Sequence, residues 1–364
     1  MFIALAAALA WQAPSTEAAH LGYFAETSLM RIAGFEMPDL PPGMEMPEMP
    51  GMAFLPGKPQ RSLEIRLWSP GVAPKDAFAF VAPPQGLGQG PRLDLKIVRP
   101  SKGGEPAEAD DQDAKGERKP PDFTIKIYWG SSPKVREGQP KVFRFKDLGF
   151  GQQAGLLRQW AQAQMAKGAS DAARPDATLA HWPSGDKPVR IAPSARLAGT
   201  FHLETNYAGQ VDLEVPKELD FLAPFDLTSP DLSGKPDLSK ALALQWKPIP
   251  TLLGTHAMIF GMQGQETLIL WYAGETWDEK ADVDWDFLQM AEVRRLVEQK
   301  VLLKGDATSA TVPEGIFRGA DFVMLRMTGY GPSVARADVQ PVPRLQTKTT
   351  LMAILGGKML DEME

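Results

Sequence analysis

The best candidate group of ligands in the chain is an acidic segment at 275–286, ETWDEKADVDWD. Its alternating carboxylates belong to Asp282, Asp284 and Asp286. Carboxylate oxygens at this spacing can surround a calcium ion, which takes about six to eight oxygen ligands. An EF-hand register would require Gly and Glu where the chain has Phe287 and Val293. The segment therefore predicts either a calcium site or acidic caps for a following helix, with Asp284 or Asp286 as the N-cap.

A second group of potential ligands lies in the Met- and Pro-rich segment 37–52. Its closely spaced thioethers belong to Met44, Met46, Met49 and Met52. Thioethers are soft ligands that select Cu(I), so copper handling is one hypothesis. The alternative is an apolar arm on the surface of a following domain, with flexible Met side chains filling irregular gaps. The prolines fix φ and remove backbone donors, which predicts extended or polyproline II structure in either case.

Tryptophans flank the acidic segment and could bind a ligand. Trp277 and Trp285 have acidic neighbours, so we expect them on the surface, where aromatic rings bind sugars or proteins. Trp271 alternates with the apolar Ile269, which predicts a core position instead.

The usual catalytic constellations are absent from the sequence. There is no cysteine, which excludes disulfides, thiolate zinc sites and thiol nucleophiles, and only 4 histidines are present. No Gly-x-Ser-x-Gly, His-Glu-x-x-His or phosphate-loop motif occurs. A hydrolase with paired carboxylates needs neither histidine nor cysteine, and 45 acidic residues leave that alternative open. The formal net charge of −6 argues against a nucleic-acid partner.

The first residues, MFIALAAALAWQA, have the length of a signal-peptide core, and Ala8-Leu9-Ala10 has the small-x-small form of a cleavage site. No Lys or Arg precedes Arg31, so an ordinary apolar helix is the alternative. No later stretch approaches 18 apolar residues. We therefore expect an exported protein, periplasmic or extracellular, without a transmembrane segment in its mature chain.

Period-2 alternation dominates the rest of the chain and predicts antiparallel sheets with one buried face. Leu63, Ile65 and Leu67 alternate with polar residues, and similar patterns recur at 93–97 and 123–129. The intervening segment 100–121 is charged and nearly free of apolar residues, so we expect a mobile loop.

Two segments have helical periodicity instead. Apolar stripes mark 151–168, with Leu156, Leu157, Trp160 and Met165, and 287–300, with Met290, Val293, Leu296 and Val297. Each predicts an amphipathic helix whose stripe packs on a sheet.

The C-terminal part resembles a fibronectin type III domain. Leu244-x-Trp246-x-Pro248-x-Pro250 resembles the B-to-C region, where the Trp packs in the core. The residues from Thr311 to Tyr330, including Val312-Pro313, are similar to its F and G end, although the helix at 287–300 departs from the pattern. As a whole, the chain resembles an uncharacterised family of exported bacterial proteins with a Met/Pro-rich arm, a resemblance that implies no function or site residues.

These observations predict a mainly β protein of two or three antiparallel sandwich-like units with two amphipathic helices. The expected divisions are a signal-like segment 1–20, an arm 21–58, a β unit 59–150, a helix 151–168, a β unit 180–238, a fibronectin-like unit 240–356 and a tail 357–364. The function that fits best is non-catalytic binding or assembly at the cell envelope, with an envelope protein, a polysaccharide or a second copy as partner. Calcium and Cu(I) are the candidate cofactors.

Overall fold

The computed structural model describes residues 18–35, 56–99, 123–144, 177–185, 189–264, 266–277 and 286–357. The expected signal segment, Met/Pro-rich stretch, charged loop and helix at 151–168 lie essentially outside these ranges. Within them, no helix is long and apolar enough to cross a membrane.

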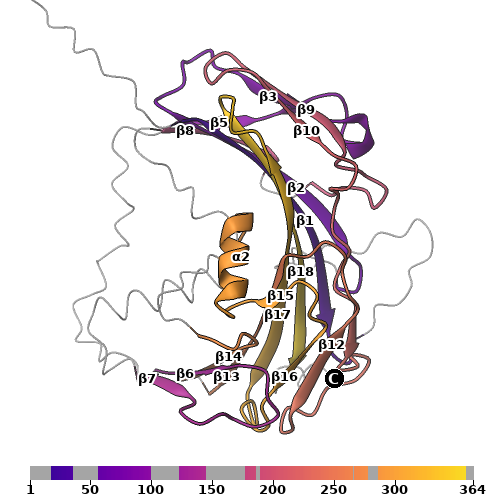
Figure 1. Ribbon diagram of the computed structural model, residues 1–364, viewed down its shortest axis with the longest axis vertical. Helices are drawn as coiled ribbons and strands as arrows, with labels where there is room; N and C mark the ends of the chain where they lie inside the picture. Colours follow the sequence, from indigo (N-terminus) through magenta and orange to yellow (C-terminus); the bar gives the residue numbers. More distant parts are fainter. Residues whose placement is uncertain are drawn as a thin grey trace, which may run out of the picture.

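An 11-stranded, strongly curved sheet dominates the fold (Figure 1). Its strands are β1 His20–Ile32, β2 Gln60–Pro70, β5 Lys96–Val98, β6 Thr124–Trp129, β7 Lys141–Arg144, β8 Ala177–Trp182, β13 Gly254–Gln263, β14 Thr267–Tyr272, β15 Leu303–Lys304, β17 Phe322–Ala335 and β18 Val342–Gly356. Their order is β5-β8-β2-β1-β18-β17-β13-β14-β6-β7, and β15 also pairs with β13. Neighbours are antiparallel except for the parallel pairs β1–β18 and β14–β6.

Two smaller sheets pack on the convex face of the large sheet (Figure 1). One has four strands, in the order β10-β9-β3-β4: β3 Ala79–Ala82, β4 Leu93–Asp94, β9 Gly199–Thr205 and β10 Val211–Val215. The other has three strands, in the order β11-β12-β16: β11 Leu227–Ser229, β12 Leu242–Trp246 and β16 Ser309–Val312. A short 3₁₀ turn, η1 Gln85–Leu87, joins β3 to β4. The expected class, mainly β with sandwich-like layers, is confirmed.

Each small sheet encloses its own hydrophobic core. Leu63, Ile65 and Leu67 of β2 are buried under the four-stranded sheet, as their alternation predicts. Trp246 and Trp271 are buried in the core under the three-stranded sheet. Strands from the expected units 59–150 and 240–356 pair in the same large sheet, so one continuous layer supports both cores.

A polar seam separates the two cores on the convex face. Thr27, Thr255 and Thr349 line it and are almost completely buried. Next to them is Gly329, where a Cβ atom would lie 3.0 Å from Leu252 Cδ2. The glycine lets the covering loop approach the sheet closely at this point.

Among the described residues there is one α-helix, α2 Met290–Glu298, which lies on the concave face (Figure 1). Val293 and Leu296 are buried against Tyr330 of β17, so the apolar stripe packs as its periodicity predicts. The expected N-cap is wrong for Asp286: the helix begins after Gln289, whose side chain makes no capping hydrogen bond. Asp286 lies too far upstream because the chain is extended up to Gln289.

Candidate functional site

The concave face of the large sheet carries an array of apolar side chains on neighbouring strands. We call this array the apolar field; it consists of Met30, Ile32, Phe260, Met262, Leu270, Phe322, Met324, Met352 and Ile354. Strand register aligns Ile32, Ile354 and Met324 in one row that continues through Phe260 and Leu270. All members are partly exposed, whereas Val323 and Ala353, which lie between members on β17 and β18, are buried in the convex core.

Beyond β14, the field continues into an aromatic cluster at the edge of the sheet. Trp277 stacks on Trp129 with ring centroids 5.7 Å apart and meets Phe143 edge-on at 6.1 Å. Lys141 Nζ lies 5.0 Å from the Trp277 ring centroid. Trp277 is therefore partly buried by its own neighbours, and Trp285 lies outside the described residues.

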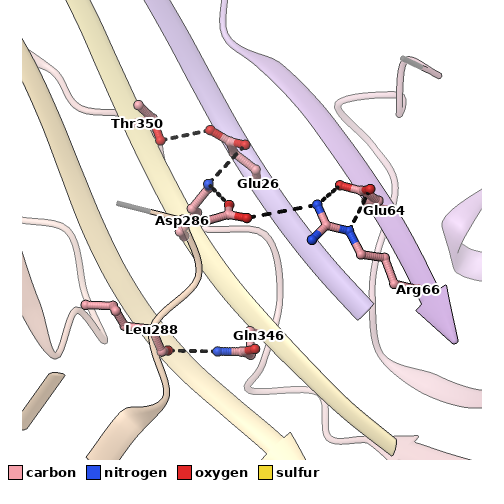
Figure 2. A network of polar contacts seen from close by, with 8 residues as sticks. Glu26, Glu64, Arg66, Asp286, Leu288, Gln346 and Thr350 are labelled. Atoms are coloured by element: carbon pink, nitrogen blue, oxygen red, sulfur yellow. Dashed lines mark hydrogen bonds and ion pairs between the residues drawn. The ribbon is translucent and has the colours of Figure 1, made fainter. Parts of the chain in front are cut away.

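A charged cluster lies on the same concave face, centred on Lys348 of β18. Its side chain is 7% exposed, and Nζ lies 3.0 Å from Asp286 Oδ1 and 3.6 Å from Glu26 Oε2. The hydroxyl of Thr350 donates to the other Glu26 oxygen at 2.8 Å (Figure 2). The ammonium is thus shared by a carboxylate of β1 and one from the segment that precedes α2.

Arg66 of β2 extends this cluster. Its guanidinium donates to both oxygens of Glu64, at 2.8 and 2.9 Å, and lies 3.9 Å from Asp286 Oδ2 (Figure 2). Aromatic rings cover both cations: Arg66 lies 5.0 Å from the Phe24 centroid, and Lys348 Nζ lies 4.1 Å from the Phe287 centroid. Ring faces attract cations, so they strengthen the cluster where water is excluded.

The cluster fastens the chain that enters α2 to the sheet. Besides the contacts of Asp286, the side chain of Gln346 donates to the backbone carbonyl of Leu288 at 2.8 Å (Figure 2). Phe287 packs on Phe24 with centroids 5.0 Å apart. The segment that precedes α2 is therefore held on the sheet by ion pairs, a side-chain amide and ring packing from β1, β2 and β18.

Between the charged cluster and the apolar field lies a belt of buried polar residues. His256 and Arg326 are 3% and 8% exposed. Burial, followed by the Arg326 charge, holds the pKa of His256 well below 6.5. Burial also lowers the pKa of Arg326, against the opposing influence of Tyr330, Glu26 and Asp286. Thr328 is 1% exposed, and among the described residues its hydroxyl has no hydrogen-bond partner.

Of the three predicted calcium ligands, Asp286 is the one that lies within the described residues. Asp286 pairs with Lys348 and Arg66, so a calcium ion would have to compete with two cations for its carboxylate. Asp282 and Asp284 lie outside the described residues, as do the thioethers of Met44, Met46, Met49 and Met52. The described part of the chain contains no group of three or more His, Asp or Glu side chains that could hold a metal.

Glu26 and Asp286 form a carboxylate pair on this face that can be compared with the pair of a hydrolase. Their oxygens lie about 6.6 Å apart at most, because they contact the same ammonium at 3.6 and 3.0 Å. Paired carboxylates in glycosidases are roughly 5 to 9.5 Å apart. Here, however, Lys348 lies between them, where a hydrolase would place the scissile bond or a water.

The sequence reasoning missed Glu26, Lys348 and Arg326, although each leaves a signal. Each is a charged residue in the interior of a long strand whose neighbouring alternate positions are uncharged. A charge at such a position requires a partner on the same face, because burying an unpaired charge is costly.

Comparison with known proteins identified no family: no family model matches the sequence, and no curated protein is significantly similar to it. The geometry of the concave face is therefore the basis on which we infer a function.

Proposed function

We propose that the protein is an exported, non-catalytic binding protein of the cell envelope, and that it binds its ligand on the concave face of the large sheet. The observation that carries this proposal is the apolar field, whose side chains are partly exposed while the opposite face is buried under two sheets. Extended apolar surfaces on proteins commonly mark interaction sites.

The cellular location of the protein is part of this proposal. The apolar N-terminal run and its Ala8-Leu9-Ala10 sequence support export to the periplasm or beyond. The absence of cysteine is compatible with that environment. The partner would accordingly be an envelope protein, a polysaccharide, a lipid or a second copy of the chain.

A charged substitution within the field tests the proposal. Met324→Glu would place a carboxylate among Phe260, Ile354 and their neighbours and should reduce capture of envelope components at least tenfold. Val72→Glu is the matched control, because Val72 is 62% exposed outside the field. Met324→Ala, which adds no charge, shows whether any loss reflects unfolding. If Met324→Glu captures the same components as the wild type, the concave face is not the binding surface.

The carboxylate pair supports a second candidate, a hydrolase that acts on envelope polymers. The oxygens of Glu26 and Asp286 that contact Lys348 lie no more than about 6.6 Å apart, but Lys348 between them favours an anchoring role. Incubating the protein with purified envelope polysaccharide distinguishes the two candidates. Turnover that is lost in both Glu26→Gln and Asp286→Asn would establish the hydrolase and refute the non-catalytic proposal.

Copper handling by the arm is a separate proposal that only the sequence supports. A Cu(I) titration of the full chain should then show binding that is lost when Met44, Met46, Met49 and Met52 are all replaced by Leu. Identical titrations of the two proteins would eliminate it.

A further inference from the structure

The apolar field has the size and chemistry to hold a hydrocarbon chain. Along β17, the field begins next to Arg326 and extends to Phe322, and the six residues from Thr328 to Phe322 correspond to about 20 Å at the usual rise of about 3.3 Å per residue. One acyl chain spans about half of a bilayer core that is ~30 Å thick. The field is therefore long enough for an extended acyl chain that runs along the strands from Thr328 and Arg326.

The residue types in the field also favour a lipid over a protein or a polysaccharide. Met30, Met262, Met324 and Met352 provide flexible thioether side chains that adapt to ligands without fixed shape. The strands below them are paired on both sides, so they offer no free edge to which a peptide strand could add. A sugar would require polar groups to fix its hydroxyls, and the field offers hydrocarbon and thioether surface instead.

One end of the field provides donors for a polar head group. Strand register places Arg326 between Met352 and Met258, and Thr328 one step further along β17, next to Thr350 and His256. The hydroxyl of Thr328 is one of several buried polar groups that make no hydrogen bond within the described part of the chain, and it lies on the concave face beside Arg326. The planar guanidinium of arginine matches carboxylate and phosphate oxygens.

We infer that the ligand of the concave face is a lipid with an anionic head group. Its acyl chain lies along the apolar field, and its head group accepts hydrogen bonds from the Thr328 hydroxyl and the Arg326 guanidinium. This inference rests on the proposed function, because it names the ligand class of the same face.

Equilibrium dialysis of the full chain with palmitate, below its micellar concentration, tests the inference. We expect palmitate to bind at least tenfold more tightly than 1-hexadecanol, which has the same chain without the charge. Acetate, which has the charge without the chain, should not compete. Met324→Glu should abolish binding of both long-chain probes, whereas Val72→Glu should bind them as the wild type does.

Thr328→Val isolates the head-group contact. It removes an unpartnered hydroxyl at nearly constant shape, so the fold should be retained while palmitate affinity falls three- to tenfold. Arg326→Met should remove the preference for palmitate over hexadecanol. The preference for palmitate over hexadecanol is measured on the wild-type protein, so the inference stays testable if Arg326→Met does not fold.

The possible negative results distinguish failure of the lipid inference from failure of the proposed binding function. If palmitate does not bind to the wild type, or binds equally well to Met324→Glu, the lipid inference is overturned. The proposed binding function is then judged separately, by whether Met324→Glu loses capture of envelope components. Loss of capture without palmitate binding would leave the face as a binding surface for another kind of ligand.

Discussion

The ammonium group of Lys348 lies 3.0 Å from a carboxylate oxygen of Asp286, although 62 residues separate them in the chain. The same ammonium also contacts Glu26, so one cation joins β18, β1 and the chain that enters α2. Ion pairs therefore hold the segment that precedes α2 on the sheet, in addition to the packing of Val293 and Leu296 within the helix.

Replacing Lys348 by Met should destabilise the protein by roughly 3 kcal/mol, because two carboxylates would then face each other in a largely buried site. The same change at Lys240, which is 77% exposed and pairs with Asp237, should change stability by less than about 1 kcal/mol. Urea denaturation measures both without adding ionic strength. Equal effects at the two positions would show that the cluster contributes no more than a surface ion pair.

His256 should make stability depend on pH. Burial, and then the Arg326 charge, hold its pKa well below 6.5, so His256 stays neutral in the folded protein while the unfolded chain takes up a proton as the pH falls. The stabilisation is therefore complete above pH 6.5 and is lost below it, by about 1.4 kcal/mol per pH unit. Urea unfolding at several pH values should show a smaller decline for His256→Gln. Parallel profiles for the two proteins would contradict this assignment.

Gly274 lies where the loop after β14 approaches the turn after α2. A Cβ atom there would lie 2.2 Å from the carbonyl oxygen of Val301, a backbone atom that cannot rotate away. Gly274→Ala should therefore cost roughly 1 to 3 kcal/mol, the range for overpacking. Gly234→Ala is the control, because no atom lies within 4 Å of its added Cβ. Thermal unfolding midpoints compare the two, and similar midpoints would mean that the loop moves aside at little cost.

Calcium should leave the stability of the wild-type protein unchanged, because Lys348 and Arg66 already neutralise Asp286. The unfolding midpoint is therefore expected to be the same in millimolar calcium and in chelator. A calcium-dependent rise in the wild type that disappears in Asp286→Asn would show instead that this carboxylate binds the ion.

Local patterns in the sequence predict the strands and their buried faces well. The alternation of Leu63, Ile65 and Leu67 is a property of neighbouring residues, and these residues are buried as expected. Strand β1 has the same alternation at Leu21 and Tyr23, yet it falls within ranges expected to be a leader and an arm. The apolar run before it and the prolines after it dominate the local composition and obscure the strand.

The candidate site could not be predicted in the same way, because its contacts are long-range. Thr350 and Glu26 are 324 residues apart in the sequence and become neighbours through the parallel pairing of β1 with β18. Its acidic neighbours in the sequence make Asp286 a candidate calcium ligand, yet its described partners come from β18 and β2. Strand order decides which charges meet, and period-2 alternation carries no information on strand order.

The pairing of β1 with β18 also affects how the chain can fold during synthesis. Among the described strands, β18 alone joins two groups of the large sheet, β5-β8-β2-β1 and β17-β13-β14-β6-β7, the second of which includes β15 beside β13. Because β18 is the last of these strands to be synthesised, the two groups can join into one sheet only after the ribosome has completed β18.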